Sequence, residues 1–306
     1  MIKRTLYFGN PAYLSLRNAQ LVITKPDDGD LPLMDVSEQV RTIPIEDIGV
    51  IVIDNKQITI TSVVMSALLD NNVAMITCNE HSMPTGLMLP LHANTLQSER
   101  FQDQLEASLP LRKQLWQQTI EAKIRNQAAV LKYISGQEAR NMIAWSNSVK
   151  SGDSENMEAR AAAFYWKNVF PDLDFFARDR YGPAPNNLLN YGYAVLRAIM
   201  ARALVATGLL PTMGIHHHNR YNAYCLADDI MEPYRPFVDK LVVDIVKDNP
   251  CPQLTREIKA RLLSIPVLDV NIDGHRSPLM IAASTTSASL YKCFAGSSRK
   301  LLYPEL

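Results

Sequence analysis

Residues 187–207 read NLLNYGYAVLRAIMARALVAT, a stretch whose apolar residues recur at the spacing of an α-helix. Gly208 follows directly and Pro211 comes three residues later, a pattern typical of a helix C-terminus. Arg197 and Arg202 interrupt the apolar run, so we expect no membrane-spanning segment. The stretch therefore predicts one long helix within a helical domain.

The same helical periodicity begins well before this stretch, at Ser98. Leu109–Ser135 and Glu155–Asn168 carry apolar residues three and four positions apart. We therefore expect a mostly helical region from residue 93 to residue 306.

The first part of the chain has the periodicity of strands. Short apolar runs rich in β-branched residues lie at residues 21–24, 48–54 and 73–78, with turn-forming residues at 26–30. Between them, residues 61–71 have helical spacing, with Thr61 or Ser62 as the N-cap. We predict an α+β protein in which residues 1–92 form a small sheet domain with one helix packed on it.

Composition excludes several protein classes. The 306 residues are 47% hydrophobic and 20% charged, values typical of a globular protein. The four cysteines form no C-x-x-C pair, so neither a zinc ribbon nor a thioredoxin-like motif is present. The N-terminus reaches Asn10 and Pro11 before an apolar signal-peptide run can develop, so we expect a cytoplasmic protein.

Charge is distributed unevenly along the chain. The formal net charge of zero argues mildly against a simple nucleic-acid binder. Residues 26–54, however, hold eight acids and one base, whereas residues 100–150 hold eight bases and four acids. The later part of the chain can therefore present a basic face.

Residues 214–239, GIHHHNRYNAYCLADDIMEPYRPFVD, combine three histidines with four carboxylates. On a helix beginning at Asn222, Asp228 and Asp229 would share a face with Glu232 and repel it, by about 0.2–0.5 kcal/mol per pair. A divalent cation would reverse that sign, and this donor set suits Mg²⁺ or Mn²⁺, although it also permits zinc. The alternative to a metal site is a solvated helix face with no catalytic role.

The three consecutive histidines cannot all point in one direction, so we expect one of His216, His217 and His218 to coordinate a metal. Another ligand must come from elsewhere, and Glu158, in an alanine-rich stretch, is the best candidate. Either Arg160 or a metal could neutralise Glu158, which could equally be a favourable charge near a helix N-terminus.

Other catalytic signatures are missing from the sequence. It contains no phosphate-binding loop of the form G-x-x-x-x-G-K-[ST], no H-E-x-x-H and no G-x-S-x-G. Basic residues interleaved with aromatic residues could contact DNA phosphates, although solvated helix faces explain them equally well. These candidates are Lys123, Arg125, Arg178, Arg180 and Arg197.

Several segments together resemble one family, the CRISPR-associated spacer-acquisition endonuclease/integrase. A G-D-x-x-N-x-E-A signature matches residues 152–159, and an N-x-x-L-N-Y-G-Y-A segment matches residues 186–194. The block from Gly208 through Gly214-Ile215-His216-His217 to residues 231–239, MEPYRPFVD, also matches. The form of these segments and the chain length look more like members from type II systems.

This resemblance implies a metal-binding triad of Glu158, His217 and Glu232, with Asp229 as a possible additional ligand and Asp239 in a structural role. It implies a β-sandwich-like N-terminal domain on the dimerisation and partner side, followed by a larger all-α catalytic domain. It also implies a homodimer that joins a small ferredoxin-like partner in a heterohexamer, and possibly the type II effector nuclease.

The activity implied by the resemblance is Mg²⁺- or Mn²⁺-dependent joining of the 3′-OH ends of short duplex DNA to repeat boundaries by transesterification. Because one phosphodiester replaces another, no nucleotide hydrolysis is needed, which agrees with the missing phosphate loop. Two alternatives remain open from the residues alone. One is a nuclease that only hydrolyses DNA or RNA, and the other is a non-catalytic DNA-binding scaffold, with zinc stabilisation as a variant.

Overall fold

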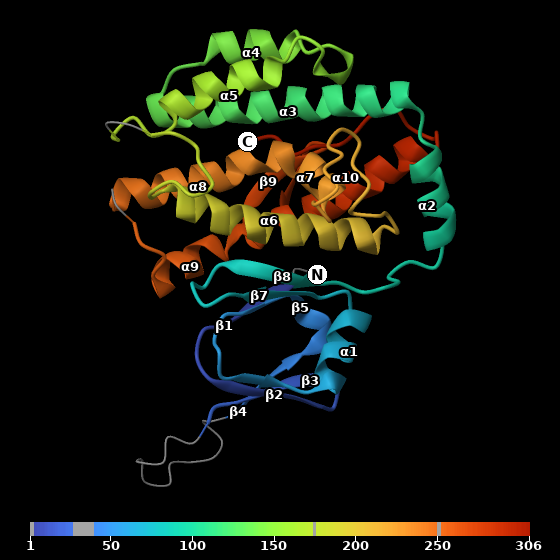
Figure 1. Ribbon diagram of the computed structural model, residues 1–306, viewed down its shortest axis with the longest axis vertical. Coiled ribbons are helices and arrows are strands. Elements are labelled where there is room, and N and C mark those ends of the chain that lie inside the picture. Colours follow the sequence, from blue (N-terminus) through green and yellow to red (C-terminus); the bar gives the residue numbers. More distant parts are fainter. Residues whose placement is uncertain (1–2, 27–39, 174–175, 250–251) are drawn as a thin grey trace. The chain divides into compact units, whose positions relative to one another are not determined.

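The computed structural model describes residues 3–26, 40–173, 176–249 and 252–306. The chain divides into two compact units, Met1–Ala93 and Asn94–Leu306 (Figure 1). The predicted turn falls mostly on residues 27–30, which lie outside the described residues, as does Cys251.

The first unit contains two four-stranded sheets. One sheet has the order β1-β5-β7-β8, with β5 parallel to β1 and β7, and β8 antiparallel to β7. The other has the order β4-β3-β2-β6. The bounds are β1 Arg4–Phe8, β5 Ile48–Ile53, β7 Ala74–Cys78 and β8 Pro84–Met88; β2 Ala12–Arg17, β3 Gln20–Thr24, β4 Val40–Pro44 and β6 Ile58–Ile60.

Apolar side chains from both sheets and from helix α1 (Ser62–Asp70) form one core in this unit. Leu14 and Leu21 come from one sheet, Ile51 from the other and Leu68 from α1, and all four are fully buried. The predicted strands and helix are confirmed, and the arrangement is sandwich-like. Thr61 occupies the N-cap position of α1, but its side chain makes no capping hydrogen bond.

The second unit is predominantly helical. Its helices are α2 Gln97–Glu106, α3 Leu109–Ser135, α4 Arg140–Asn147, α5 Met157–Asn168, α6 Asn186–Ala206, α7 Cys225–Met231, α8 Arg235–Asp248, α9 Arg256–Leu262 and α10 Leu279–Phe294. Figure 1 shows α3, α4 and α5 on one side of the layer formed by α6, α8 and α10. Single turns of 3-10 helix, η3 Ser151–Asp153 and η4 Glu232–Tyr234, precede α5 and α8. The predicted helix boundaries of Leu109–Ser135 are confirmed.

Helix α6 is the central helix of this unit. By length and composition it could cross a membrane. However, 78% of its most apolar 18-residue stretch is buried within the protein, as in the core helix of a globular domain. Gly192 permits close packing against α8, because a Cβ there would lie 2.5 Å from Val238 Cγ1. This close packing holds α8 against α6, and with it the η4 turn that precedes α8.

The helical unit also contains a short hairpin within the region expected to be mostly helical. Strands β9 (Asp269–Ile272) and β10 (His275–Pro278) pair antiparallel, and Asn271 bridges to Glu305. Asp273 and Gly274 have φ values of 50° and 77°, as a two-residue hairpin turn requires. The expected all-α domain therefore carries a two-stranded sheet, and its Asp-Gly pair was the overlooked signal.

Candidate active site

Glu158 lies in the first turn of α5, and the residues before it form a tight turn that caps this helix. Gly152, Asp153 and Asn156 have φ values of 69°, 50° and 55°, a region that glycine enters freely and that Asp and Asn tolerate better than most residues. The Asp153 carboxylate accepts hydrogen bonds from the backbone N–H groups of Met157 (2.8 Å) and Glu158 (3.0 Å). The G-D-x-x-N part of the signature therefore positions the glutamate, a role that sequence reasoning did not assign.

Glu232 begins the 3-10 turn η4, directly after α7. Pro233 lacks a backbone N–H, so the α-helical hydrogen-bond pattern cannot continue through it. The predicted helix start at Asn222 is wrong, because α7 begins at Cys225. Asn222 instead turns the chain, its Oδ1 accepting from the Tyr224 N–H at 2.9 Å.

Each of the three acids in this segment has a partner in the structure. Asp228 accepts from Arg197 Nε (2.6 Å) and from Asn222 Nδ2 (2.7 Å). Asp229 accepts from the backbone N–H of His216, in the loop of residues 214–222, which we call the histidine loop. Glu232 contacts two cations, Lys123 and Arg235. These partners offset the expected mutual repulsion of the acids.

Glu158 and Glu232 converge on the ammonium group of Lys123, which projects from α3. Lys123 Nζ lies 2.6 Å from Glu158 Oε1 and 2.6 Å from Glu232 Oε2. The lysine and Glu232 are buried, whereas Glu158 is partly open to solvent. Burial alone would lower the pKa of Lys123, but Glu232 and Glu158 outweigh that effect and raise the pKa.

This location corrects two predictions. Lys123 is not an exposed phosphate contact, because its charge is buried between two carboxylates. Arg160 is not the partner of Glu158, since its guanidinium stacks over the Trp145 ring at 4.7 Å. Two carboxylates held close together, one of them buried, need a cation, and the lysine on the neighbouring helix supplies it.

Glu232 is held on both sides. Arg235, one helical turn further on, places Nε 2.9 Å from Glu232 Oε1. Burial tends to raise the pKa of the Glu232 carboxyl, but Arg235 and then Lys123 overcome it and lower the pKa. Glu232 therefore remains an anion in a buried position, as a metal ligand must. The E-x-x-R spacing was the sequence signal for this clamp.

His217 is oriented by Asp229. Its Nδ1 lies 2.5 Å from Asp229 Oδ1, while the same carboxylate accepts from the backbone N–H of His216 at 2.8 Å. The hydrogen bond to Asp229 raises the pKa of His217 and assigns Nδ1 as the donor, which leaves Nε2 as the nitrogen for a ligand. Asp229 is fully buried, and both of its oxygens take part in hydrogen bonds with His216 and His217, while its role as an additional ligand stays a prediction.

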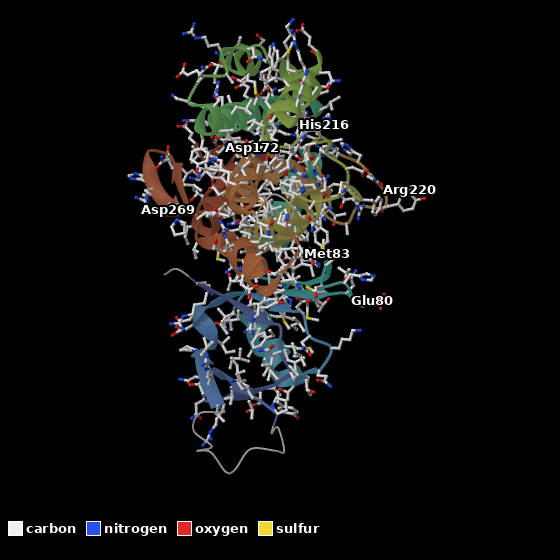
Figure 2. The ribbon with its side chains drawn as sticks, turned by 90° about the vertical axis from the view of Figure 1, so that its left-hand side faces the viewer. Glu80, Met83, Asp172, His216, Arg220 and Asp269 are labelled. Atoms are coloured by element: carbon white, nitrogen blue, oxygen red, sulfur yellow. The ribbon has the colours of Figure 1, made fainter. Side chains whose placement is uncertain are left out.

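The three histidines diverge, as the geometry of consecutive residues requires. His216, labelled in Figure 2, stacks on Trp116 with ring centroids 4.1 Å apart, and burial lowers its pKa. The exposed His218 places Nδ1 2.5 Å from the His216 carbonyl oxygen. A Cβ at Gly214 would lie 2.4 Å from the His217 carbonyl oxygen, so this loop can close against Asp229 only with glycine there.

The remaining candidate basic residues already have protein partners. Arg178 donates to the side chains of Asn186 (3.0 Å) and Asn190 (2.7 Å), and Arg125 donates to Asn147 Oδ1 at 3.3 Å. Arg180 lies over the exposed ring of Tyr181, and Arg197 pairs with Asp228 while keeping 41% of its side chain exposed. Figure 2 also shows Arg220, which was not predicted, projecting from the histidine loop.

Asp239 lies in the core beside the site. It accepts hydrogen bonds from the hydroxyl groups of Tyr165 (2.9 Å) and Tyr193. Burial raises the pKa of its carboxyl to about 6, although both hydroxyl groups counteract this shift. These contacts fit the structural role predicted for Asp239.

No group of three histidine, cysteine or acidic side chains is arranged to hold a metal within residues 3–26, 40–173, 176–249 and 252–306. Glu158 and Glu232 nevertheless already bind one cationic atom between them, and His217 is close enough that both acids raise its pKa. Two carboxylates and an imidazole are the donor types that a divalent cation such as Mn²⁺ accepts, so Glu158, Glu232 and His217 would be the residues to hold it.

The family model of the CRISPR-associated protein Cas1 matches residues 6–253 of the chain. The chain belongs to the Cas1 family. The CRISPR-associated endonuclease Cas1 of Neisseria meningitidis serogroup C (strain 8013) is 34% identical over 309 residues, which cover 100% of this chain and 97% of that protein. The endonuclease Cas1 2 of Saccharolobus solfataricus is 27% identical, covering 78% of this chain and 73% of its own.

Solved structures with the same fold include Cas1 proteins and a related enzyme. A casposase bound to its integration product has a TM-score of 0.78 at 22% identity and covers 98% of this chain and 92% of its own. A Cas1 protein from Thermotoga maritima has a TM-score of 0.72 at 15% identity, covering 96% of this chain and 98% of its own. These structures share the mixed fold predicted from the sequence of this Cas1-family protein.

Proposed function

We propose that this Cas1-family protein joins the 3′-OH ends of short duplex DNA to the boundaries of a CRISPR repeat by metal-dependent transesterification. The observation that carries the proposal is the convergence of Glu158 and Glu232 on a single cation, with a half-exposed His217 beside them. Acids arranged in this way suit phosphodiester chemistry better than a structural ion pair, because the site is open on the Glu158 side.

Glu158, His217 and Glu232 are the residues that would hold Mg²⁺ or Mn²⁺. When bound, such an ion polarises the phosphodiester and makes a hydroxyl group a better nucleophile. The protein supplies the positioning: Asp229 fixes the tautomer of His217, Arg235 keeps Glu232 ionised, and Asp153 anchors the helix of Glu158.

The DNA path is proposed from charge and exposure. Arg125 and Arg197 retain exposed guanidinium groups. Arg180 lies beside the exposed ring of Tyr181, and Arg178, in the same loop before α6, donates a hydrogen bond to Asn186. Arg and Tyr side chains together suit phosphate contacts and stacking. We propose that these arginines bind the backbone of the duplex.

We also propose how this protein assembles and which type of CRISPR system it belongs to. One solved structure with this fold is a Cas6-RT-Cas1–Cas2 complex, with a TM-score of 0.75 at 18% identity; the match covers 100% of this chain and 36% of that chain. We propose that this protein forms a homodimer through the side of residues 1–92 and assembles with a small ferredoxin-like partner into a heterohexamer. The form of its Asn-Tyr-Gly-Tyr and Ile-His-His segments supports a type II system, in which the effector nuclease is a further partner.

Strand transfer from a labelled short duplex into a repeat-containing plasmid tests this function. We expect Glu158→Ala, His217→Ala and Glu232→Ala each to abolish branched product, whereas Glu138→Ala, which breaks an exposed ion pair with Lys132, retains it. Cleavage without branched product would favour a nuclease that only hydrolyses. Activity that EDTA leaves unchanged, or a triad variant with normal integration, would contradict the proposed mechanism.

A further inference from the structure

The ammonium group of Lys123 lies where an ion bridging Glu158 and Glu232 would lie. Both Nζ–oxygen contacts measure 2.6 Å, and the lysine side chain is only 11% exposed. Elsewhere on α3, Lys132 pairs with Glu138 at 3.0 Å, but both of those side chains are more than half exposed. The buried pair at Lys123 is therefore different in kind from an ordinary surface ion pair.

We propose that Lys123 is a built-in counter-cation that holds the two metal-binding acids together before a divalent ion binds and is displaced by that ion. The inference rests on the proposed metal dependence. Lys123 thus acts as a positioning residue that sets the affinity of the site for metal, and its role extends beyond the triad of ligands.

The chemistry of an ammonium group makes the exchange necessary. A protonated lysine has three donors and no lone pair, so it cannot itself ligate a metal. The two carboxylate oxygens that contact Nζ are the oxygens that a bridging ion would use. An ammonium and a divalent ion cannot both stay in contact with them, because the like charges would repel at that distance.

The surroundings allow Lys123 to move while the acids stay in place. Glu232 is anchored through its other oxygen by Arg235, so the loss of the lysine contact does not free it. Glu158 is 26% exposed, which leaves a route for an ion to enter and for the ammonium to leave. The four-carbon stem of lysine is flexible enough for that movement.

Isothermal titration with Mn²⁺ alone, without DNA, tests the exchange in wild type, in Lys123→Met and in Lys132→Met as the matched control. We expect Lys123→Met to bind Mn²⁺ roughly tenfold more tightly, because a repelling charge is removed. Its metal-free melting temperature should fall by roughly 5–10 °C, because the buried Glu232 and the partly buried Glu158 lose the cation they share, and Mn²⁺ should restore most of the loss. Lys132→Met should match wild type in both measurements.

The outcomes separate this inference from the proposed function. If wild type binds no Mn²⁺, the proposed metal site and this exchange are both wrong. If wild type binds Mn²⁺ and Lys123→Met binds it equally or more weakly, only the exchange is wrong. Should Lys123→Met fail to fold, amine-reactive labelling of wild type decides: Mn²⁺ should raise the labelling rate of Lys123 but not that of Lys132, and an unchanged rate would refute displacement.

Discussion

Replacing Asp229 by Asn removes the charge that organises the histidine loop while conserving the size of the side chain. The carboxylate now accepts from the backbone N–H of His216, the backbone N–H of His217 and the ring of His217. An amide has one acceptor oxygen, so at least one of these donors would face an NH₂ group in a fully buried position. Hydrogen bonds to a buried charge contribute about 1.5–3 kcal/mol each, so we expect a loss of about 2–3 kcal/mol in the free energy of unfolding.

The variant should also lose metal affinity and integration, because removing an orienting carboxylate behind a ligating histidine typically costs about 10–100-fold. Urea denaturation, Mn²⁺ titration and the strand-transfer assay measure these effects. NMR should show a lower pKa for His217, since the hydrogen bond to Asp229 is the main cause of its elevation. Asp228→Asn is the matched control, because that acid pairs with Arg197 and should leave the pKa of His217 and Mn²⁺ affinity unchanged.

An Asp229→Asn protein with wild-type Mn²⁺ affinity and an unchanged pKa for His217 would refute the orienting role. A fall in stability alone would show that Asp229 only closes the loop. The same experiment thus separates packing from orientation.

Three further predictions concern residues around the site. Asp153→Ala should lower the free energy of unfolding by about 1–2 kcal/mol, measured in urea, because α5 loses the cap on two N–H groups; an unchanged midpoint would contradict this. Because the pKa of Asp239 is raised to about 6, its stabilising contribution is present below about pH 4 and lost as the pH rises through 6. Wild type should therefore lose about 3 kcal/mol relative to Asp239→Asn between pH 4 and pH 7, and parallel stability profiles would refute the shift. Gly192→Ala should destabilise the protein by about 1–3 kcal/mol in thermal unfolding, because its Cβ would clash with Val238, and equal stability would show that α6 and α8 can separate freely.

Local patterns were sufficient for much of the architecture. The strand-to-helix change in periodicity predicted the two kinds of region, and the boundaries of α3 agree with the predicted ones because its apolar spacing and the glycine after it are local signals. The hairpin of β9 and β10 was missed although its Asp-Gly turn is also local, because a four-residue strand carries little periodic signal.

The sequence by itself determined which residue types the family motifs contain: an acid after a turn that begins with glycine and aspartate, consecutive histidines, and an acid followed by proline and arginine. Only the tertiary structure decided how their charges are paired. Lys123 and Glu158 are distant in sequence from Glu232, and nothing in local spacing says that a buried ammonium joins them. The same holds for Asp228 and Asp229, which are neighbours in the chain but have different partners. Asp228 pairs with Arg197, and Asp229 contacts His217. Burial makes each unpaired charge costly, so the fold brings each acid a partner from whichever helix or loop packs against it.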